Sequence, residues 1–144
     1  MENNDTVELL KECNAGIKMG VSSIEEVLSK VKNEEFEALL EKCKEAHQFL
    51  GSETRDLLNK LGEEGKEPNA MAKGMSWIKT NVMLCVDECD NTVADLITDG
   101  CNMGVKSLNR YLNKYQAADE KAKDVTKRLI DLEHKLTIDI RKYL

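Results

Sequence analysis

Apolar residues recur every three or four positions along most of this chain, which is the period of an α-helix with one buried face. The pattern predicts four long helices, over residues 5–32, 33–61, 91–115 and 117–143. A fifth, shorter helix is predicted over residues 70–87. We therefore predict an all-α fold, an up-and-down four-helix bundle that forms a single domain over all 144 residues.

Polar residues mark the predicted helix ends. Asp5 and Glu8 have the spacing of a capping box, and Asn33 can cap the second helix. The segment Gly62–Asn69 is the clearest loop, because it holds the only proline of the chain. Three cap-type residues in a row, Asp90–Thr92, predict a break before the next helix.

The short predicted helix has two interpretations. Over residues 70–87 it would span ~27 Å, which is long enough to carry the chain back along helices of ~40 Å. Alternatively, residues 70–115 form one very long helix, for which the chain offers no partner of matching length. We favour an additional crossover helix.

The charge and its distribution exclude several classes of partner. The net charge is −6, and residues 1–105 hold 21 acidic against 11 basic residues. Such an acidic body repels phosphate backbones, so we expect no nucleic-acid binding. We also expect no membrane span and no secretory signal, since no run of ~20 apolar residues and no apolar leader is present. Five cysteines at irregular spacing then predict reduced thiols and a cytoplasmic location.

Chemistry-bearing side chains fall on the predicted buried faces. Cys13, Cys43, His47 and Cys101 lie on the apolar stripes of three helices, and no carboxylate is expected beside them. Cys43 and Cys101 occupy one layer if their helices run parallel, with His47 one turn away. Cys43, His47 and Cys101 could then hold a soft metal such as Zn²⁺ or Cu(I). The alternatives are plain core packing and redox-active thiols.

Two further pairs carry weaker signals. Cys85 and Cys89, four residues apart, would share one face of the short helix and could chelate a metal. His134 follows Asp131 at the spacing of a metal-ligand pair, but its helical angle predicts that it points outward.

Glycine pairs and off-stripe apolar residues are the remaining features. Gly16-x-x-x-Gly20 and Gly100-x-x-x-Gly104 predict either close helix approach or a locally opened helix beside a site. A secondary apolar surface that favours self-association is predicted from residues away from the stripe centres, namely Phe49, Trp77, Ile130 and Ile138.

The chain resembles a family of uncharacterised bacterial ferritin-like bundles, distant fold relatives of rubrerythrin and ferritin. The residues that carry the resemblance are Cys13–Lys18 (CNAGIK), Glu35–Leu40 (EFEALL) and Ile97–Leu108 (ITDGCNMGVKSL). The resemblance implies a ferritin-like bundle with a crossover. Relatives often have Glu at the positions that align with Lys18 and Cys101, so this chain departs from the family's iron-ligand pattern.

These observations favour a non-catalytic cytoplasmic bundle that acts by self-association, as a homo-oligomer, or by binding a protein partner. One alternative is a soft-metal or thiol-redox protein that uses its buried Cys and His residues. Another is a ferritin-like oxidoreductase with a degenerate metal site. The sequence shows no catalytic constellation. We expect no cofactor, apart from the Zn²⁺ or Cu(I) of the alternative, and no di-iron centre, because inward carboxylates are missing.

Overall fold

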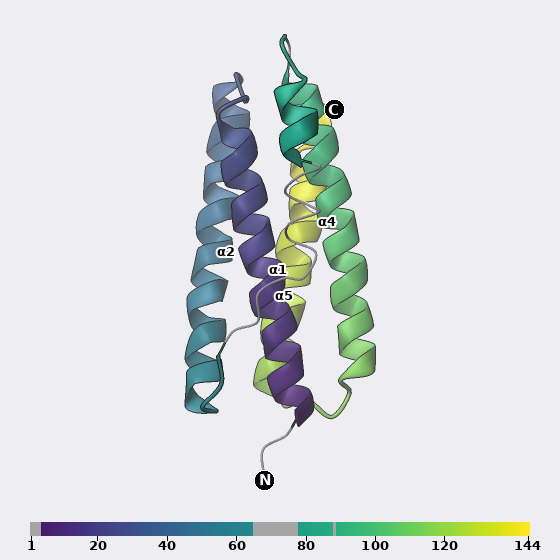
Figure 1. Cartoon of the computed structure of the whole chain (residues 1–144). Helices are drawn as coiled ribbons and strands as arrows, with labels where there is room; N and C mark the ends of the chain where they lie inside the picture. The colour runs from purple at the N-terminus through teal and green to yellow at the C-terminus, as the bar shows by residue number, and fades with distance from the viewer. Residues whose placement is uncertain (1–3, 65–77, 88) are drawn as a thin grey trace.

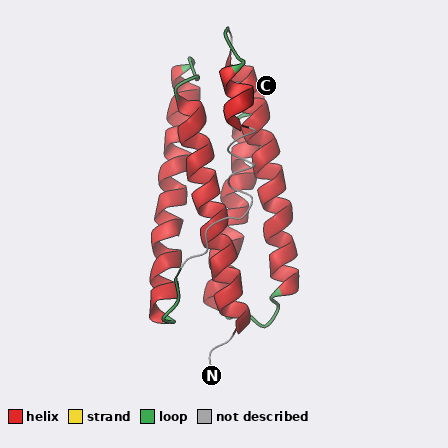
Figure 2. Cartoon of the chain, viewed as in Figure 1, coloured by secondary structure: helices red, strands yellow, loops and turns green. Residues whose placement is uncertain are grey.

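The computed structural model describes residues 4–64, 78–87 and 89–144. Helix is the only regular secondary structure in these ranges (Figure 2). The long helices are α1 (Asn4–Leu28), α2 (Glu34–Lys60), α4 (Cys89–Lys114) and α5 (Glu120–Asp139), followed by the 3₁₀ turn η1 (Arg141–Tyr143). The predicted all-helical class is therefore confirmed.

The helices form two antiparallel hairpins that pack side by side (Figure 1). One hairpin is α1 with α2, and the other is α4 with α5. Helix α1 also packs against α4 and α5, and α2 packs against α5. Helix α2 ends near the N-terminal end of the bundle, whereas α4 begins at the opposite end (Figure 1). The end of α2 and the start of α4 therefore lie at opposite ends of the bundle, and the two helices run in the same direction (Figure 1).

The short helix predicted over residues 70–87 is observed only in part. Residues 78–83 are helical, and residues 70–77 lie outside the described residues. The helix ends before Cys85, and α4 begins at Cys89. The interpretation of residues 70–115 as one continuous helix is therefore wrong.

The turn between α1 and α2 explains why the first helix ends at Leu28, earlier than predicted. The carboxylate of Asp90 accepts hydrogen bonds from the backbone N–H groups of Lys32 (2.8 Å) and Asn33 (3.0 Å). These N–H groups are thus bound from another helix instead of continuing α1. Asn33 is the predicted cap, and its side chain accepts a hydrogen bond from the N–H of Phe36 at 2.9 Å.

The last helix begins three residues later than predicted. Asp119 is its N-cap, and its side chain accepts a hydrogen bond from the N–H of Ala122 at 2.9 Å. A carboxylate at this position satisfies one of the free N–H groups of the first turn. The segment between Lys114 and Asp119 is therefore a turn.

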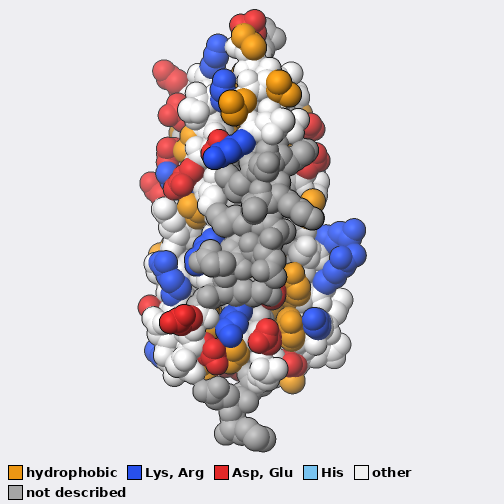
Figure 3. Space-filling view, viewed as in Figure 1, with side chains coloured by type: hydrophobic (Ala, Val, Ile, Leu, Met, Phe, Trp, Pro, Cys, Tyr) orange, Lys and Arg blue, Asp and Glu red, His pale blue; other side chains and the backbone are white. Residues whose placement is uncertain are grey.

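The apolar stripes meet along the axis of the bundle. Three clusters of buried side chains follow one another along its length, built from all four long helices. Charged side chains of both signs are mixed on the outer face that Figure 3 shows. Among the described residues, no helix has the length and apolar character that a bilayer span requires. A polar side chain on this buried axis is therefore shielded from water.

Candidate functional site

The residues predicted to form an interior site are buried as expected. Cys43, His47 and Cys101 have exposed fractions of 6%, 1% and 7%. Cys43 and Cys101 belong to the same cluster of core side chains, although they lie on α2 and α4. This packing agrees with the expectation that Cys43 and Cys101 occupy one layer of the bundle.

A carboxylate joins them, which contradicts the expectation of a carboxylate-free interior. Glu133 on α5 is 7% exposed and is the only buried acidic residue in the described ranges. Its Oε1 lies 3.7 Å from Nε2 of His47. Glu133 stands four residues after Leu129 and three before Leu136, which puts it at the edge of the apolar stripe of its helix and is the signal by which the sequence could have indicated it.

Hydrogen bonding fixes the orientation of the His47 ring. Nδ1 lies 2.9 Å from the carbonyl oxygen of Cys43, and because a carbonyl only accepts, Nδ1 carries a proton and donates it. The Cys43 sulfur is 3.6 Å from the same nitrogen. Nε2 is thereby left as the ring atom that faces Glu133.

Each member of this pair has one buried atom without a hydrogen-bond partner. Nε2 of His47 and Oε2 of Glu133 are both buried without one, and Nδ2 of Asn14 is the third such atom in the described residues. A buried polar group without a partner costs ~1–3 kcal/mol of folding free energy. Two such atoms, one in each member of a facing pair, therefore call for an explanation.

The electrostatics of the cluster couple its members. Burial lowers the pKa of His47, but the neighbouring Cys43 sulfur and Glu133 carboxylate outweigh it and raise that pKa to about 10. Burial raises the pKa of Glu133, and His47 opposes this. Burial, with Glu133 and Cys43 nearby, also raises the pKa of the Cys101 thiol. Within the pair each side chain therefore favours the charged form of the other, against the effect of burial.

Two glycines provide the space that the pair occupies. A Cβ placed on Gly20 of α1 would lie 2.8 Å from Cδ2 and Nε2 of His47. A Cβ on Gly104 of α4 would collide with the carboxylate of Glu133. Both glycines are the second members of the Gly-x-x-x-Gly pairs. Helices α1 and α4 continue unbroken through them, so the structure shows close approach by a side chain of a neighbouring helix and not a locally opened helix.

Cys13, by contrast, is a satisfied core residue. Its sulfur lies 3.0 Å from Oγ1 of Thr126, whose hydroxyl donates to the carbonyl of Ala122. The thiol of Cys13 is therefore the donor to Thr126. Burial raises the pKa of Cys13 to about 12, which keeps it protonated.

The cluster is not a preformed metal cage. Among the described residues, no three His, Cys, Asp or Glu side chains converge closely enough to hold a metal ion. A di-iron carboxylate centre needs several inward carboxylates. One buried Glu does not supply them. His134 is exposed, as predicted from its helical angle.

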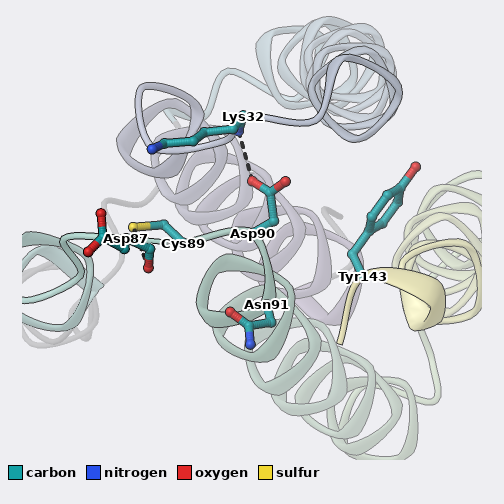
Figure 4. Close-up of a pocket in the computed structure, with 6 residues that line it drawn as sticks. All are labelled: Lys32, Asp87, Cys89, Asp90, Asn91 and Tyr143. Atoms are coloured by element: carbon teal, nitrogen blue, oxygen red, sulfur yellow. Dashed lines mark hydrogen bonds between the residues drawn. The ribbon is translucent and has the colours of Figure 1, made fainter.

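Cys85 and Cys89 form a disulfide bond, which contradicts the expectation that all five cysteines are reduced. They do not share the face of one helix, because the chain turns between them and Cys89 is the first residue of α4. Cys89 also lines an open pocket of about 790 Å³ beside Asp90 and Tyr143 at one end of the bundle (Figure 4). The remaining cysteines are free and buried.

Comparison with known proteins shows the fold alone. No family model and no curated protein matches the chain. Among solved structures, the crystal structure of a DUF305 fragment from Deinococcus radiodurans is similar, with a TM-score of 0.78. The similarity covers 96% of this chain and 94% of that one, at 10% sequence identity. This chain therefore has the all-helical architecture of that fragment along nearly its whole length.

Proposed function

We propose that this chain is a ferritin-like bundle that binds a metal ion of the zinc class in its interior, through His47, Glu133, Cys43 and Cys101. The observation that carries the proposal is the buried pair of His47 and Glu133. Nε2 of His47 has no hydrogen-bond partner and lies 3.7 Å from Oε1 of Glu133, and the second carboxylate oxygen, Oε2, is also buried without a partner. Imidazole and carboxylate are both electron-pair donors once the imidazolium loses its proton. A cation bound by both groups would satisfy the two side chains at once.

The surroundings of His47 match those of a metal-binding imidazole. Such a histidine usually donates its other ring N–H to a carbonyl or carboxylate, which fixes the tautomer. His47 does this through Nδ1, with the Cys43 carbonyl as acceptor. The nitrogen that remains is the one that faces Glu133.

The donor set favours Zn²⁺ over the alternatives. Zn²⁺ accepts imidazole, thiolate and carboxylate ligands in a tetrahedron, whereas Cu(I) prefers sulfur and nitrogen alone. Glu133, which the sequence did not predict as a ligand, therefore shifts the preference from Cu(I) to Zn²⁺. Binding would require the thiols of Cys43 and Cys101 to turn toward the pair and to lose their protons.

Zinc titration of the reduced, chelator-treated protein tests the proposal. We expect one Zn²⁺ per chain, measured by competition with a chromophoric chelator, with proton release on binding. Cobalt(II) offered instead should give a thiolate-to-metal charge-transfer band that Cys101→Ala weakens and that the double substitution Cys43→Ala with Cys101→Ala removes. Cys13→Ala is the matched control, because Cys13 is buried but bonded to Thr126 outside the cluster. No uptake, or equal uptake by all variants, would refute the proposal.

Glu133→Gln separates ligation from packing. The amide keeps the size of the carboxylate but removes its charge, so we expect zinc affinity to fall by ~10–100-fold while the helical content stays unchanged. Equal affinity in this variant would remove Glu133 from the site.

The ferritin-like part of the proposal is supported by the direction of the chain. Helices α2 and α4 run the same way, as in ferritin-like bundles with one long crossover. The resemblance over Cys13–Lys18 and Ile97–Leu108 supports the same assignment. We place this bacterial-type bundle in the cytoplasm.

Self-association is a second candidate, favoured by apolar side chains on the outer surface. Phe49 on α2 and Met103 on α4 are 71% and 68% exposed, and Ile138 is 44% exposed. Ile130 is half-buried, and Trp77 lies outside the described residues. Light scattering on the parent and on Phe49→Lys tests this candidate. A monomer in both would exclude it.

A further inference from the structure

The Cys85–Cys89 disulfide stands apart from the interior cluster. Cys89 and Cys101 lie on the same helix, twelve residues apart, which corresponds to ~18 Å along its axis. The bond closes a loop of five residues at the end of the bundle where α4 begins. We propose that this disulfide is a thiol–disulfide exchange site that reacts with a vicinal dithiol, and that Cys85 is the sulfur attacked.

Accessibility distinguishes the two sulfurs. Cys89, the first residue of α4, is only 2% exposed. Cys85 is half-buried, and its neighbours Leu84 and Val86 are 75% and 80% exposed. Apolar atoms are visible at this end of the molecule in Figure 3. An incoming thiolate therefore meets Cys85 first.

The position of Cys89 suits it as the leaving sulfur. It occupies the first turn of α4, where free backbone N–H groups and the helix dipole favour a negative charge. Attack on Cys85 would release charge at that place. Asp90, the next residue, is already bound to the backbone N–H groups of Lys32 (Figure 4) and Asn33, which anchors this turn.

The reaction balances as a two-electron exchange. One thiolate of the dithiol forms a bond to the Cys85 sulfur, the Cys85–Cys89 bond breaks, and the Cys89 thiolate takes a proton from water. The second thiol of the partner then attacks the mixed disulfide and releases Cys85 as a thiol. The partner leaves as a disulfide, oxidised by two electrons, and the bundle is reduced by two electrons.

The other three cysteines make the site measurable in the intact chain. They are free but at most 7% exposed, so a thiol reagent should not reach them in the folded protein. We expect no reactive thiol in the oxidised native protein, one (Cys85) after treatment with dithiothreitol without denaturant, because Cys89 is only 2% exposed, and five in denaturant after reduction. A disulfide that dithiothreitol reduces only in denaturant would overturn the proposal.

Two single variants test which sulfur is attacked. Cys89→Ser leaves Cys85 as a free thiol, and Cys85→Ser leaves Cys89. Both proteins are then offered glutathione disulfide. The Cys89→Ser protein should form a mixed disulfide at least ~10-fold faster than the Cys85→Ser protein, because the thiol of Cys89 is buried and shielded. Mass spectrometry measures both rates. Equal rates, or a faster reaction at Cys89, would overturn the assignment of Cys85.

Discussion

The space that Gly20 leaves for His47 gives a prediction that can be worked from distances. Gly16 and Gly20 lie one turn apart on α1, and both lose about 1 kcal/mol of helix stability relative to Ala. A Cβ on Gly16 would meet only Cδ2 of Leu129, at 3.9 Å, which is an ordinary contact. A Cβ on Gly20 would lie 2.8 Å from two atoms of the His47 ring.

The two alanine substitutions should therefore differ although their chemistry is the same. Gly16→Ala should raise the free energy of unfolding by up to ~1 kcal/mol, through the backbone alone. In Gly20→Ala the same gain is offset by overpacking of ~1–3 kcal/mol, because the ring is held by the Cys43 carbonyl and cannot retreat. The difference between the two variants should be ~1–3 kcal/mol.

Urea denaturation followed by circular dichroism, with EDTA present, measures that difference. Gly100→Ala and Gly104→Ala on α4 provide a second matched pair, since a Cβ on Gly100 would meet nothing within 4 Å. The cost at Gly104 should be smaller, because the Glu133 carboxylate ends a flexible side chain. If Gly16→Ala and Gly20→Ala agreed within ~0.5 kcal/mol, the argument that these glycines make room for the polar pair would fail.

Three further predictions concern the stability contributed by His47, Glu133 and Asp90. Replacing the pair by His47→Leu with Glu133→Met should leave the metal-free protein ~0–4 kcal/mol more stable in urea, because apolar groups need no partners. A loss above ~1 kcal/mol would show that the pair supports the fold. The raised pKa of His47 stabilises the folded state below pH ~6.5, and this contribution is lost as the pH rises through about 10. The parent should therefore lose stability between pH 7 and 10 relative to the double variant, His47→Leu with Glu133→Met, which has neither titrating group, and a constant difference would contradict this. Asp90→Ala should cost ~1–3 kcal/mol in thermal unfolding, because two charge-assisted hydrogen bonds to Lys32 and Asn33 are lost. An unchanged melting temperature would contradict this expectation.

The helical fold could be predicted because burial of one face imposes a period of three to four residues. His47 and Cys101 were placed correctly for that reason. Glu133 lies ~60° from the centre of the apolar stripe of its helix, outside the sector of ~40° in which inward-facing residues were expected, and it is nevertheless buried. The disulfide could not be predicted, because the sequence pattern placed Cys85 and Cys89 on one continuous helix. In the structure the chain turns between them, and the two sulfurs are bonded.

The division of the interior between the two hairpins has a consequence for folding. Gly20 and His47 belong to the first hairpin, and Gly104 and Glu133 belong to the second. Each hairpin can thus seat its own polar side chain against its own glycine while water still reaches the charge. Desolvation occurs only when the hairpins dock, so its free-energy cost falls on the docking step. A cation bound by His47 and Glu133 would offset that cost and would join the two hairpins.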